Sequence, residues 1–319
     1  METICITGSN GFIGKCLMEE ASVLNFSTYV WTKNEPDKLG HSQAIVHLAA
    51  RVHQMKDFSF NPLQEFHQAN CGLTLDLAKN GLEAGIKKFL FLSSVKIMGE
   101  NPIQQTIYTE QDIPFPDDPY GISKWEAEQG LLELFTQQSN AQCIILRLPM
   151  VYGPGNKGNM LPLLKAVSRG IPLPFGSTKG KRSMIYVKNV CDAILTILQD
   201  STPNRPPVQT YFINDNNDLT SGELYSLISQ AYTGKKGVFS LPEILFRFGG
   251  EVGSRFEKLF GKRVPINNEI VSRLFDPYRF SCEKFCKDYD WTPPYTPEEG
   301  IRETVRWYQA LSCEQGIAK

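Results

Sequence analysis

The chain has 319 residues, 41% hydrophobic and 21% charged, a composition typical of folded globular proteins and too apolar for a disordered chain. Its 33 lysines and arginines balance 34 aspartates and glutamates, and the net charge of −1 excludes the strongly basic character that nucleic-acid binding requires. No apolar run reaches the roughly 18 residues of a transmembrane helix, and a glycine motif begins at Thr7, so neither a membrane span nor a signal peptide is expected.

Short apolar runs alternate with longer segments of helical periodicity in the first half of the chain. The predicted strands are residues 4–7, 28–32, 44–50, 89–94 and 143–149. The predicted helices between them are residues 12–24, 62–84 and 120–138. Because most of these strands are apolar on successive residues, we expect a parallel sheet covered by helices on both faces, a doubly wound Rossmann-type α/β fold.

One connection is too short for the complete fold. Only residues 33–43 separate the second predicted strand from the third, whereas a parallel crossover usually needs a dozen or more residues. A full Rossmann half would place another strand here. The sheet is therefore expected to be one strand short.

The second half of the chain departs from the regular alternation of strands and helices. After a glycine- and proline-rich stretch we expect a helix at 160–169, strands at 183–187 and 208–214, and a last helix at 297–311. At roughly 150 residues per domain, the length suggests two domains. We interpret 1–150, with about 185–213 returning to the sheet, as the first domain. The segments 151–184 and 214–319 would form a smaller C-terminal α/β domain.

The segment 242–263 is amphipathic. Apolar residues recur in it near helical spacing, and between them lie Arg247, Arg255, Lys258, Lys262 and Arg263. Such a pattern is compatible with a basic helix at a membrane surface. The favoured interpretation is a helical packing element of the C-terminal domain, broken at Gly249-Gly250.

Cysteine and histidine positions give no metal site. The eight cysteines are scattered, mostly in apolar segments, which predicts reduced, buried thiols and a cytoplasmic protein. Cys282 and Cys286 could share a helix face, but two thiols without further ligands make a poor zinc site. The four histidines lack the spacing of a metal-binding helix.

A glycine motif follows the first predicted strand and opens the first helix, in the sequence Thr7-Gly8-Ser9-Asn10-Gly11-Phe12-Ile13-Gly14. Its three glycines permit a tight turn, close approach of the backbone to a pyrophosphate, and tight packing of helix on strand. The amino end of the helix then faces the phosphates. This position in the chain predicts a dinucleotide site.

A candidate catalytic group surrounds Tyr120. Three Tyr-x-x-x-Lys sequences occur, but only the one from Tyr120 to Lys124 opens a good helix, with Asp118 as N-cap and Pro119 at the first helical position. Tyr120 and Lys124 then share one helix face, where the ammonium would favour the phenolate. Ser94 ends a predicted strand at the carboxyl edge of the sheet, where its hydroxyl can bridge a substrate hydroxyl and Tyr120.

These motifs occur in a familiar order. They are Thr7-Gly-x-x-Gly-x-x-Gly14, His47-Leu-Ala-Ala50, Asn70, Ser93-Ser94, Tyr120-x-x-x-Lys124 and Arg147…Val151-Tyr-Gly-Pro154, followed by Gly158-Asn159, Arg182-Ser-Met-Ile-Tyr-Val and Trp291-Thr-Pro…Trp307-Tyr308. The chain resembles extended short-chain dehydrogenases/reductases. Within them it is most similar to the NAD-dependent epimerase/dehydratase family, near the UDP-glucose 4-epimerases of bacterial polysaccharide pathways.

The resemblance implies roles for individual residues. Ser94, Tyr120 and Lys124 would be catalytic. The dinucleotide would be held by Gly8, Gly11, Phe12, Ile13, Gly14, Lys33, Leu48, Ala49, Ala50, Asn70, Tyr120 and Lys124. The substrate would meet Ser94, Asn159, Arg182 and Arg273. The implied partners are a UDP-sugar and a second copy of the chain in a homodimer, with the first domain holding the dinucleotide and the second the sugar nucleotide.

Some positions depart from the family's pattern. Met98 and Met150 stand where relatives often carry a tyrosine and an asparagine. The second strand is followed by Trp31-Thr32-Lys33, with no acidic residue to hold an adenosine ribose. Lys33 could instead meet a 2′-phosphate, so NAD is expected and NADP stays open.

The resemblance leaves the reaction open as well. It implies a 4-epimerase of UDP-hexoses or UDP-N-acetylhexosamines. The alternatives are an NADPH-dependent UDP-4-keto-6-deoxyhexose reductase and a non-catalytic dinucleotide-sensing protein. Val95-Lys96 replace the acid pair of a dehydratase, which makes that activity less favoured.

Overall fold

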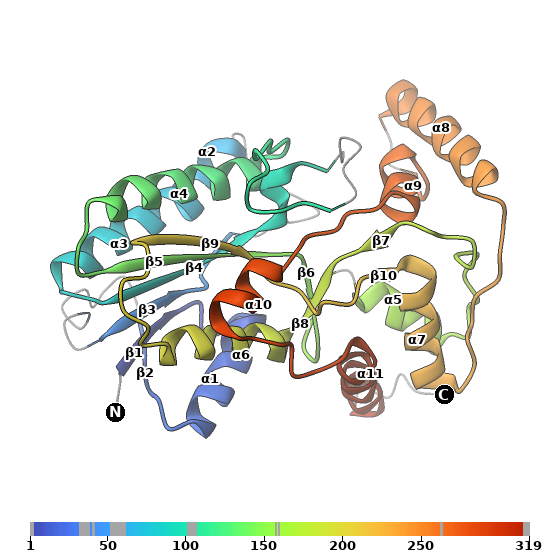
Figure 1. Ribbon diagram of the computed structural model, residues 1–319. Helices are drawn as coiled ribbons and strands as arrows, with labels where there is room; N and C mark the ends of the chain where they lie inside the picture. The colour runs from blue at the N-terminus through green and yellow to red at the C-terminus, as the bar shows by residue number, and fades with distance from the viewer. Residues whose placement is uncertain are drawn as a thin grey trace.

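A six-stranded parallel sheet forms the centre of the molecule (Figure 1). The computed structural model describes residues 3–31, 39, 42–51, 62–100, 107–156, 158, 160–261 and 264–314. The sheet's strands are β1 (Thr3–Thr7), β2 (Ser27–Val30), β3 (Ala44–His47), β4 (Lys88–Ser94), β5 (Gln142–Leu148) and β9 (Val208–Phe212). Their spatial order is β2-β1-β3-β4-β5-β9, and every neighbouring pair is parallel. The predicted doubly wound α/β fold is confirmed.

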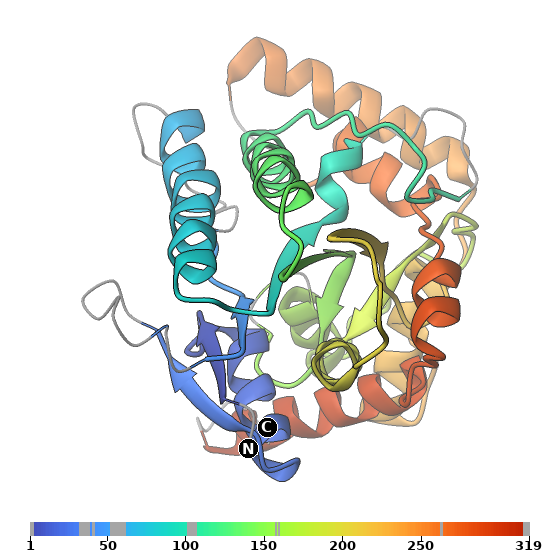
Figure 2. The same cartoon turned by 60° about the vertical axis from the view of Figure 1, so that its left-hand side comes forward.

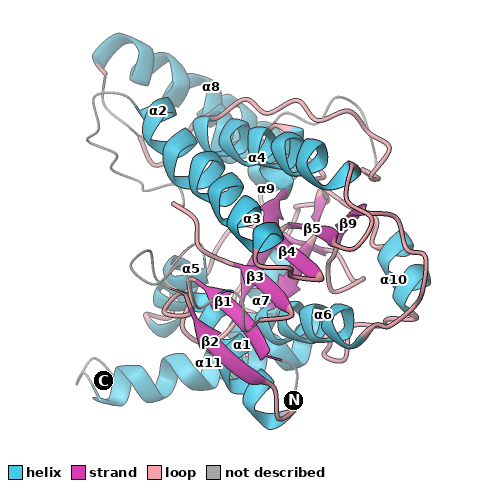
Figure 3. Ribbon diagram, turned by 90° about the vertical axis from the view of Figure 1, so that its left-hand side faces the viewer, coloured by secondary structure: helices cyan, strands magenta, loops and turns pink. Residues whose placement is uncertain are grey.

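Helices cover both faces of this sheet (Figure 3). On one face lie α1 (Phe12–Val23) and α6 (Val187–Gln199), and on the other α2 (Pro62–Phe66), α3 (Leu73–Glu83) and α4 (Pro119–Thr136). Alternate residues of a strand serve the two layers: Ile4 and Ile6 join the core beneath α1 and α6, whereas Cys5 joins the core beneath α3 and α4. This two-sided burial explains why the strands are apolar on successive residues.

The second predicted helix is interrupted in an informative place. Between α2 and α3 the chain forms a π-helix over His67–Gly72, so the predicted helix 62–84 is three consecutive helical segments. Single π-turns inside helices are frequent at functional sites. Here the π-helix carries Asn70, one of the residues expected near the dinucleotide.

The short connection between the second and third strands has the expected consequence. Only β2 lies outside β1 among the described residues, whereas the complete Rossmann order places two strands there. Strand β3 is also shorter than predicted, since it ends at His47 and leaves residues 48–50 as a loop at the carboxyl edge. As far as the structure describes the chain, the sheet has one strand fewer than the complete fold on the side of β2.

The C-terminal half adds two small sheets and further helices. Antiparallel β7 (Lys181–Arg182) and β10 (Leu219–Thr220) form one sheet, and parallel β6 (Met150–Tyr152) and β8 (Met184–Tyr186) form the other. The expected return to the central sheet is therefore made by β9, whereas β8 pairs with β6. The remaining helices here are α5 (Met160–Ser168), α7 (Ser221–Thr233), α10 (Glu283–Tyr289) and α11 (Pro297–Glu314).

The amphipathic segment forms a single helix. Helix α8 (Glu243–Phe260) runs through Gly249-Gly250 without a break, so the expected interruption is wrong. Gly250 is buried against side chains of α9 (Asn268–Phe275), which packs on α8. The glycine therefore allows the two helices to approach closely and does not end α8. Figure 2 shows α8 lying along the outer edge of the molecule. Within the described part of the chain, no helix combines the length and apolar character needed to cross a membrane.

Candidate active site

The glycine turn after β1 forms a cradle that side chains would fill. Gly8 has φ +71°, and a Cβ there would lie 2.7 Å from the amide nitrogen of Ala49. A Cβ on Gly14 would lie 2.2 Å from the carbonyl oxygen of Gly8. Both contacts are impossible, so only glycine lets the start of α1, the turn and the loop after β3 approach this closely. Leu48 and Ala49 are thereby placed beside the turn.

The amino end of α1 is left free for an anion. Gly11 is its N-cap and supplies no side-chain hydrogen bond, and no acidic residue stands in the first turn, which begins with Phe12 and Ile13. The first amides of a helix need acceptors, and the helix dipole favours a negative charge there. The residues of the turn therefore fit the pyrophosphate of a dinucleotide.

His47 is a buried link between three elements. Its Nδ1 is 2.7 Å from the Thr7 hydroxyl at the end of β1, and its Nε2 is 2.9 Å from the Thr74 hydroxyl on α3. Thr7 also accepts a hydrogen bond from the Ala49 amide at 3.2 Å. Burial, helped by the charge of Lys124, lowers the pKa of His47 to about 3. The imidazole is therefore neutral and fixes the carboxyl ends of β1 and β3 to α3.

Asn70 holds the loop after β3 to the catalytic helix. Its side chain is 1% exposed, and Oδ1 accepts from the Arg51 amide at 2.7 Å while Nδ2 donates to the Arg51 carbonyl at 3.0 Å. Nδ2 also lies 3.0 Å from the Ser123 hydroxyl, which donates to the carbonyl of Tyr120 at 2.8 Å. The geometry makes Asn70 a positioning residue that connects the expected cofactor loop to Tyr120.

Ser94 and Tyr120 come together at the carboxyl edge of the sheet. Ser94 ends β4, and its hydroxyl accepts from the Lys96 amide at 3.2 Å. It also lies close enough to the phenol of Tyr120 to act on its pKa. Asp118 caps α4 as predicted, because its Oδ1 accepts from the Gly121 amide at 2.6 Å. A Cβ on Gly121 would lie 2.6 Å from the Lys96 carbonyl oxygen, so glycine there brings the helix start against the chain after Ser94.

Burial controls the protonation of Tyr120. It raises the pKa of the phenol to about 12, opposed by the hydrogen bond from Ser94 and reinforced by the charge of Asp118. The expected contribution of Lys124 to this pKa is not among these causes. In the free protein Tyr120 is thus a proton donor at neutral pH. Acting as a base would require positive charge from a bound, oxidised nicotinamide.

Lys124 is a buried cation with an unusual setting. Its side chain is 2% exposed and its Nζ lies 4.1 Å from the centre of the Phe91 ring. Burial lowers the pKa of Lys124 to about 7, while the nearby carboxylate of Glu128 opposes the shift. A buried ammonium with an aromatic face on one side would be stabilised by acceptors such as ribose hydroxyls.

Glu128 is a site residue that the sequence reasoning missed. It is 2% exposed, lies one turn after Lys124, and accepts hydrogen bonds from Arg147 on β5 at 2.7, 3.2 and 3.3 Å. Glu128 is therefore the buried counter-charge for two cations. The spacing of four between Lys124 and Glu128 on the buried face of α4 was the available signal.

The two expected diphosphate arginines approach one another. The guanidinium of Arg182 lies 4.9 Å from the centre of the Tyr278 ring, and the Tyr278 hydroxyl donates to the carbonyls of Val95 and Gly99 at 2.8 Å. Burial, with a contribution from the charge of Arg273, lowers the pKa of Arg182. Arg182 is thus tied through Tyr278 to the segment that follows Ser94.

Arg273 and Lys96 share one acidic partner, Glu100, near this segment. Arg273 pairs with Glu100 at 2.7 Å, and Lys96 contacts Glu100 and lies 3.5 Å from Asp118. In the sequence, Lys96 was notable only because it replaces an acid of the dehydratases. In the structure it is a further cation beside Ser94. Burial lowers its pKa, with the charge of Arg273 acting in the same direction.

Two predicted ligand contacts fall outside the described residues, and the two methionines that differ from the family's pattern lie within them. Lys33 and Asn159 lie outside the described residues. Met98 is buried in the 3-10 helix Val95–Met98, and Met150 is half-buried in β6.

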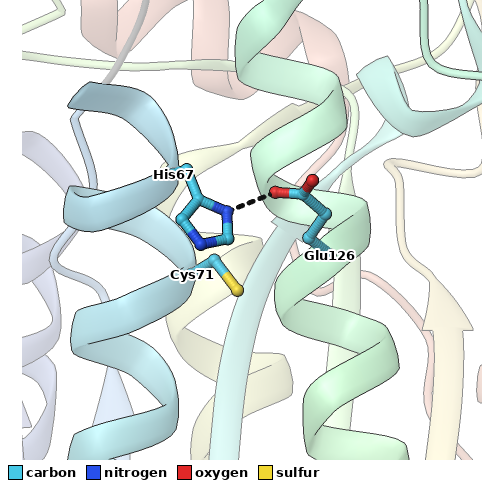
Figure 4. A group of neighbouring side chains, drawn as sticks. All are labelled: His67, Cys71 and Glu126. Carbon is cyan, nitrogen blue, oxygen red and sulfur yellow. Dashed lines mark hydrogen bonds and ion pairs between the residues drawn. The ribbon is translucent and has the colours of Figure 1, made fainter. Parts of the chain in front are cut away.

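One side-chain cluster beside the site was not anticipated (Figure 4). His67 and Cys71 on the π-helix face Glu126 on α4, and their potential ligand atoms lie within 4.8 Å of one another. His67 Nδ1 is 2.7 Å from a carboxylate oxygen of Glu126. Burial and the charge of Glu126 raise the pKa of Cys71 to about 11, so the thiol stays protonated although metals bind the thiolate. The cluster links the π-helix to α4.

Comparison with known proteins agrees with this geometry. The profile described as "NAD dependent epimerase/dehydratase family" matches residues 4–209. The chain belongs to this family. It is 32% identical to the UDP-glucose 4-epimerase of Vibrio cholerae over 327 aligned residues, 96% of this chain and 95% of that one.

More distant relatives also align with nearly the whole of this chain. It is 25% identical to the N-acetyl-α-D-glucosaminyl-diphospho-ditrans,octacis-undecaprenol 4-epimerase of Escherichia coli O157:H7, over 96% of this chain and 95% of that one. Among solved structures, MoeE5 in complex with UDP-glucuronic acid and NAD matches with a TM-score of 0.73 at 20% identity, covering 97% of this chain and 99% of that one. The last comparison supports the fold.

Proposed function

We propose that this family member is an NAD-dependent 4-epimerase that interconverts UDP-hexoses or UDP-N-acetylhexosamines through a 4-keto intermediate. The observation that carries the proposal is the group of half-buried Ser94 and Tyr120 with buried Lys124, at the carboxyl edge of the sheet beside a glycine cradle that fits a dinucleotide. The similarity to the Vibrio cholerae enzyme supports the choice of reaction.

The residues of the site divide the chemistry between them. Ser94 and Tyr120 would hydrogen-bond the sugar 4-hydroxyl, and Tyr120 would take up its proton and later return it. The nicotinamide supplies the hydride acceptor and donor at C4 when the cofactor is bound. Lys124 would hold the ribose hydroxyls of the cofactor, and Gly8, Gly11 and Gly14 its pyrophosphate.

The sugar nucleotide would be held by the C-terminal half. Arg182 and Arg273, with Asn159, are the proposed contacts to its diphosphate, since a guanidinium binds phosphate oxygens bidentately. A firm hold on the diphosphate would leave the hexose free to turn over its flat 4-keto form, which a 4-epimerase requires. In this proposal residues 1–150 with 185–213 bind the dinucleotide, and 151–184 with 214–319 bind the sugar nucleotide.

A second candidate has an observation of its own. Trp31-Thr32-Lys33, directly after β2, supply no acidic residue for an adenosine ribose, and Lys33 could meet a 2′-phosphate. A Tyr120 phenol that is protonated in the free protein suits an acid that protonates a reduced carbonyl. An NADPH-dependent UDP-4-keto-6-deoxyhexose reductase is therefore the alternative.

One experiment separates the two candidates. The purified protein is denatured and any released nucleotide identified, and the native protein is incubated with UDP-glucose or UDP-N-acetylglucosamine without added cofactor. Released NAD with interconversion of the sugars supports the epimerase. Protein without nucleotide that oxidises NADPH only in the presence of a UDP-4-keto-6-deoxyhexose contradicts it and supports the reductase.

The assay should include a matched variant pair and a second carrier. Tyr120→Phe removes the proposed proton carrier, whereas Tyr232→Phe alters another Tyr-x-x-x-Lys sequence at the end of α7. Only the first should abolish turnover. Because the name of the Escherichia coli relative places its sugar on a diphospho-undecaprenol carrier, N-acetylglucosamine on that carrier is a useful parallel substrate.

A further inference from the structure

Helix α8 is anchored along one side only. Its buried residues are Phe246, Gly250 and Gly253. Phe246 packs on Phe275 of α9 with ring centres 5.1 Å apart, and a Cβ on Gly253 would lie 1.9 Å from the carbonyl oxygen of Ile266. This close backbone contact fixes how α8 is rotated. Its other sides face away from α9.

The outward side of α8 is strongly apolar. Seven of its large hydrophobic side chains are exposed: Ile244 (71%), Leu245 (56%), Phe248 (71%), Val252 (52%), Phe256 (43%), Leu259 (79%) and Phe260 (62%). At 100° per residue they occupy one continuous arc. A monomeric protein rarely exposes an apolar patch of more than a few hundred Å² unless the patch binds something.

Cations dominate the charged edge of this apolar arc. Arg247, Arg255 and Lys258 are exposed, although Arg247 pairs with Glu243 and Asp276, and Arg255 pairs with Glu251. Residues 242–263 carry five basic and three acidic side chains in the sequence, so this segment keeps a net positive charge. Glu243 and Glu257 are half-buried, and Glu257 is turned toward the α9 side, where it accepts from the Val264 amide at 2.8 Å. An outward apolar face with a cationic edge is the pattern of helices that lie in the headgroup region of a bilayer.

We propose that α8 docks this protein on the surface of a membrane that contains anionic lipids, with its apolar arc inserted among the headgroups. The helix lies at the outer edge of the molecule in both views, so a flat surface can reach it (Figures 1 and 2). Anionic headgroups would pair with Lys258 and would compete with Glu243 and Glu251 for Arg247 and Arg255, whose exposed ion pairs are individually weak. A second copy of the chain fits less well, because a two-fold contact would bring the same cationic edges together.

Docking on this side has a consequence for the site. Helix α9, on which α8 packs, carries Arg273, and the charge of Arg273 reaches Arg182. If the proposed function is correct, the membrane would lie on the side of the molecule that holds the diphosphate of the substrate. This consequence rests on the proposed function, whereas docking itself does not.

The test is binding of the full chain to vesicles, measured by flotation. Vesicles of phosphatidylglycerol and phosphatidylethanolamine are compared with vesicles of phosphatidylcholine alone. We expect the wild type to bind the anionic vesicles, and the double variant Phe248→Ser/Leu259→Ser to bind at least about 100-fold more weakly, since two buried apolar side chains are lost. The control Val23→Ser/Leu24→Ser removes exposed apolar side chains at the end of α1 and should bind like the wild type.

Three further measurements distinguish membrane docking from misfolding and from dimer formation. Both double variants should keep the wild-type circular dichroism and the sugar interconversion without vesicles, because all four positions are exposed and outside the site. A Phe248→Trp variant should show a blue-shifted emission with anionic vesicles, quenched by brominated lipids. The proposal is wrong if the wild type fails to float with anionic vesicles. It is also wrong if light scattering shows a dimer that Phe248→Ser/Leu259→Ser dissociates while vesicle binding is absent.

Discussion

Replacing Lys124 by methionine should stabilise the protein while abolishing its activity. The ammonium is 2% exposed, and burial lowers its pKa from 10.5 to about 7. A lowered pKa means that the unfolded chain binds more protons than the native one between these two values, so the free energy of unfolding rises with pH there. Below about pH 7 both states carry the proton, and the cost of burying the charge is complete.

The magnitude follows from the two pKa values. A difference of about 3.5 pKa units corresponds to on the order of 5 kcal/mol, which is a large share of the usual 5–15 kcal/mol of a folded protein. Methionine keeps the length and fills the space over Phe91, and Glu128 keeps its hydrogen bonds to Arg147. The free energy of unfolding of the variant should therefore exceed that of the wild type by up to about 5 kcal/mol near pH 6.

The assay is urea unfolding of both proteins from about pH 6 to about pH 10. Subtracting the free energy of unfolding of one protein from that of the other cancels the contributions of the cysteines and tyrosines, because these groups titrate in both proteins. The gap should close progressively as the pH rises from about 7, where the native lysine deprotonates, toward 10.5, where the unfolded lysine does. Lys79→Met, at an exposed position on α3, serves as the control and should show no comparable gap. A Lys124→Met protein that is less stable than the wild type, or a gap independent of pH, would refute the reasoning.

Three further substitutions test other parts of the site. Glu128→Gln leaves Arg147 and Lys124 without a buried counter-charge and should lower the free energy of unfolding by about 3 kcal/mol or more in urea unfolding. Asn70→Ala removes the hydrogen bonds that join the loop after β3 to Ser123, and should lower stability by about 1–3 kcal/mol and raise the Kd for NAD in calorimetry. Gly14→Ala puts a Cβ 2.2 Å from a carbonyl oxygen and should abolish NAD binding, whereas Gly130→Ala meets only the mobile Leu75 side chain and should keep it.

Local patterns in the sequence were sufficient for the fold and for the centre of the site. Apolar strands alternating with helices identify a sheet covered on both faces, and the Asp118-Pro119 start of α4 fixes which Tyr-x-x-x-Lys sequence reaches Ser94. These features depend on residues close together in the chain. The bounds of β3 and the continuity of α8 could not be read in this way, because loop geometry and packing on α9 decide them.

The groups that the sequence did not reveal are those whose roles depend on partners from other elements. Glu128 looks like an ordinary helical carboxylate until β5 places Arg147 beside it. Asn70 was expected to contact the cofactor, yet both ends of its amide are engaged with Arg51 and Ser123. Both residues are nearly inaccessible to solvent, and both hold groups that would meet the dinucleotide.

Lys124 connects these findings. The pKa of Lys124 is low mainly because the ammonium is buried, with the Glu128 carboxylate nearby and the Phe91 ring on one side. Hydrogen-bond acceptors of a bound ligand would stabilise the charged form of the lysine. Binding of a dinucleotide should therefore raise the pKa of Lys124 and take up protons near neutral pH. Calorimetry of NAD binding in buffers of different ionisation enthalpy would show this uptake, and Lys124→Met should remove it. Binding without proton uptake would mean that the ribose hydroxyls do not stabilise the ammonium.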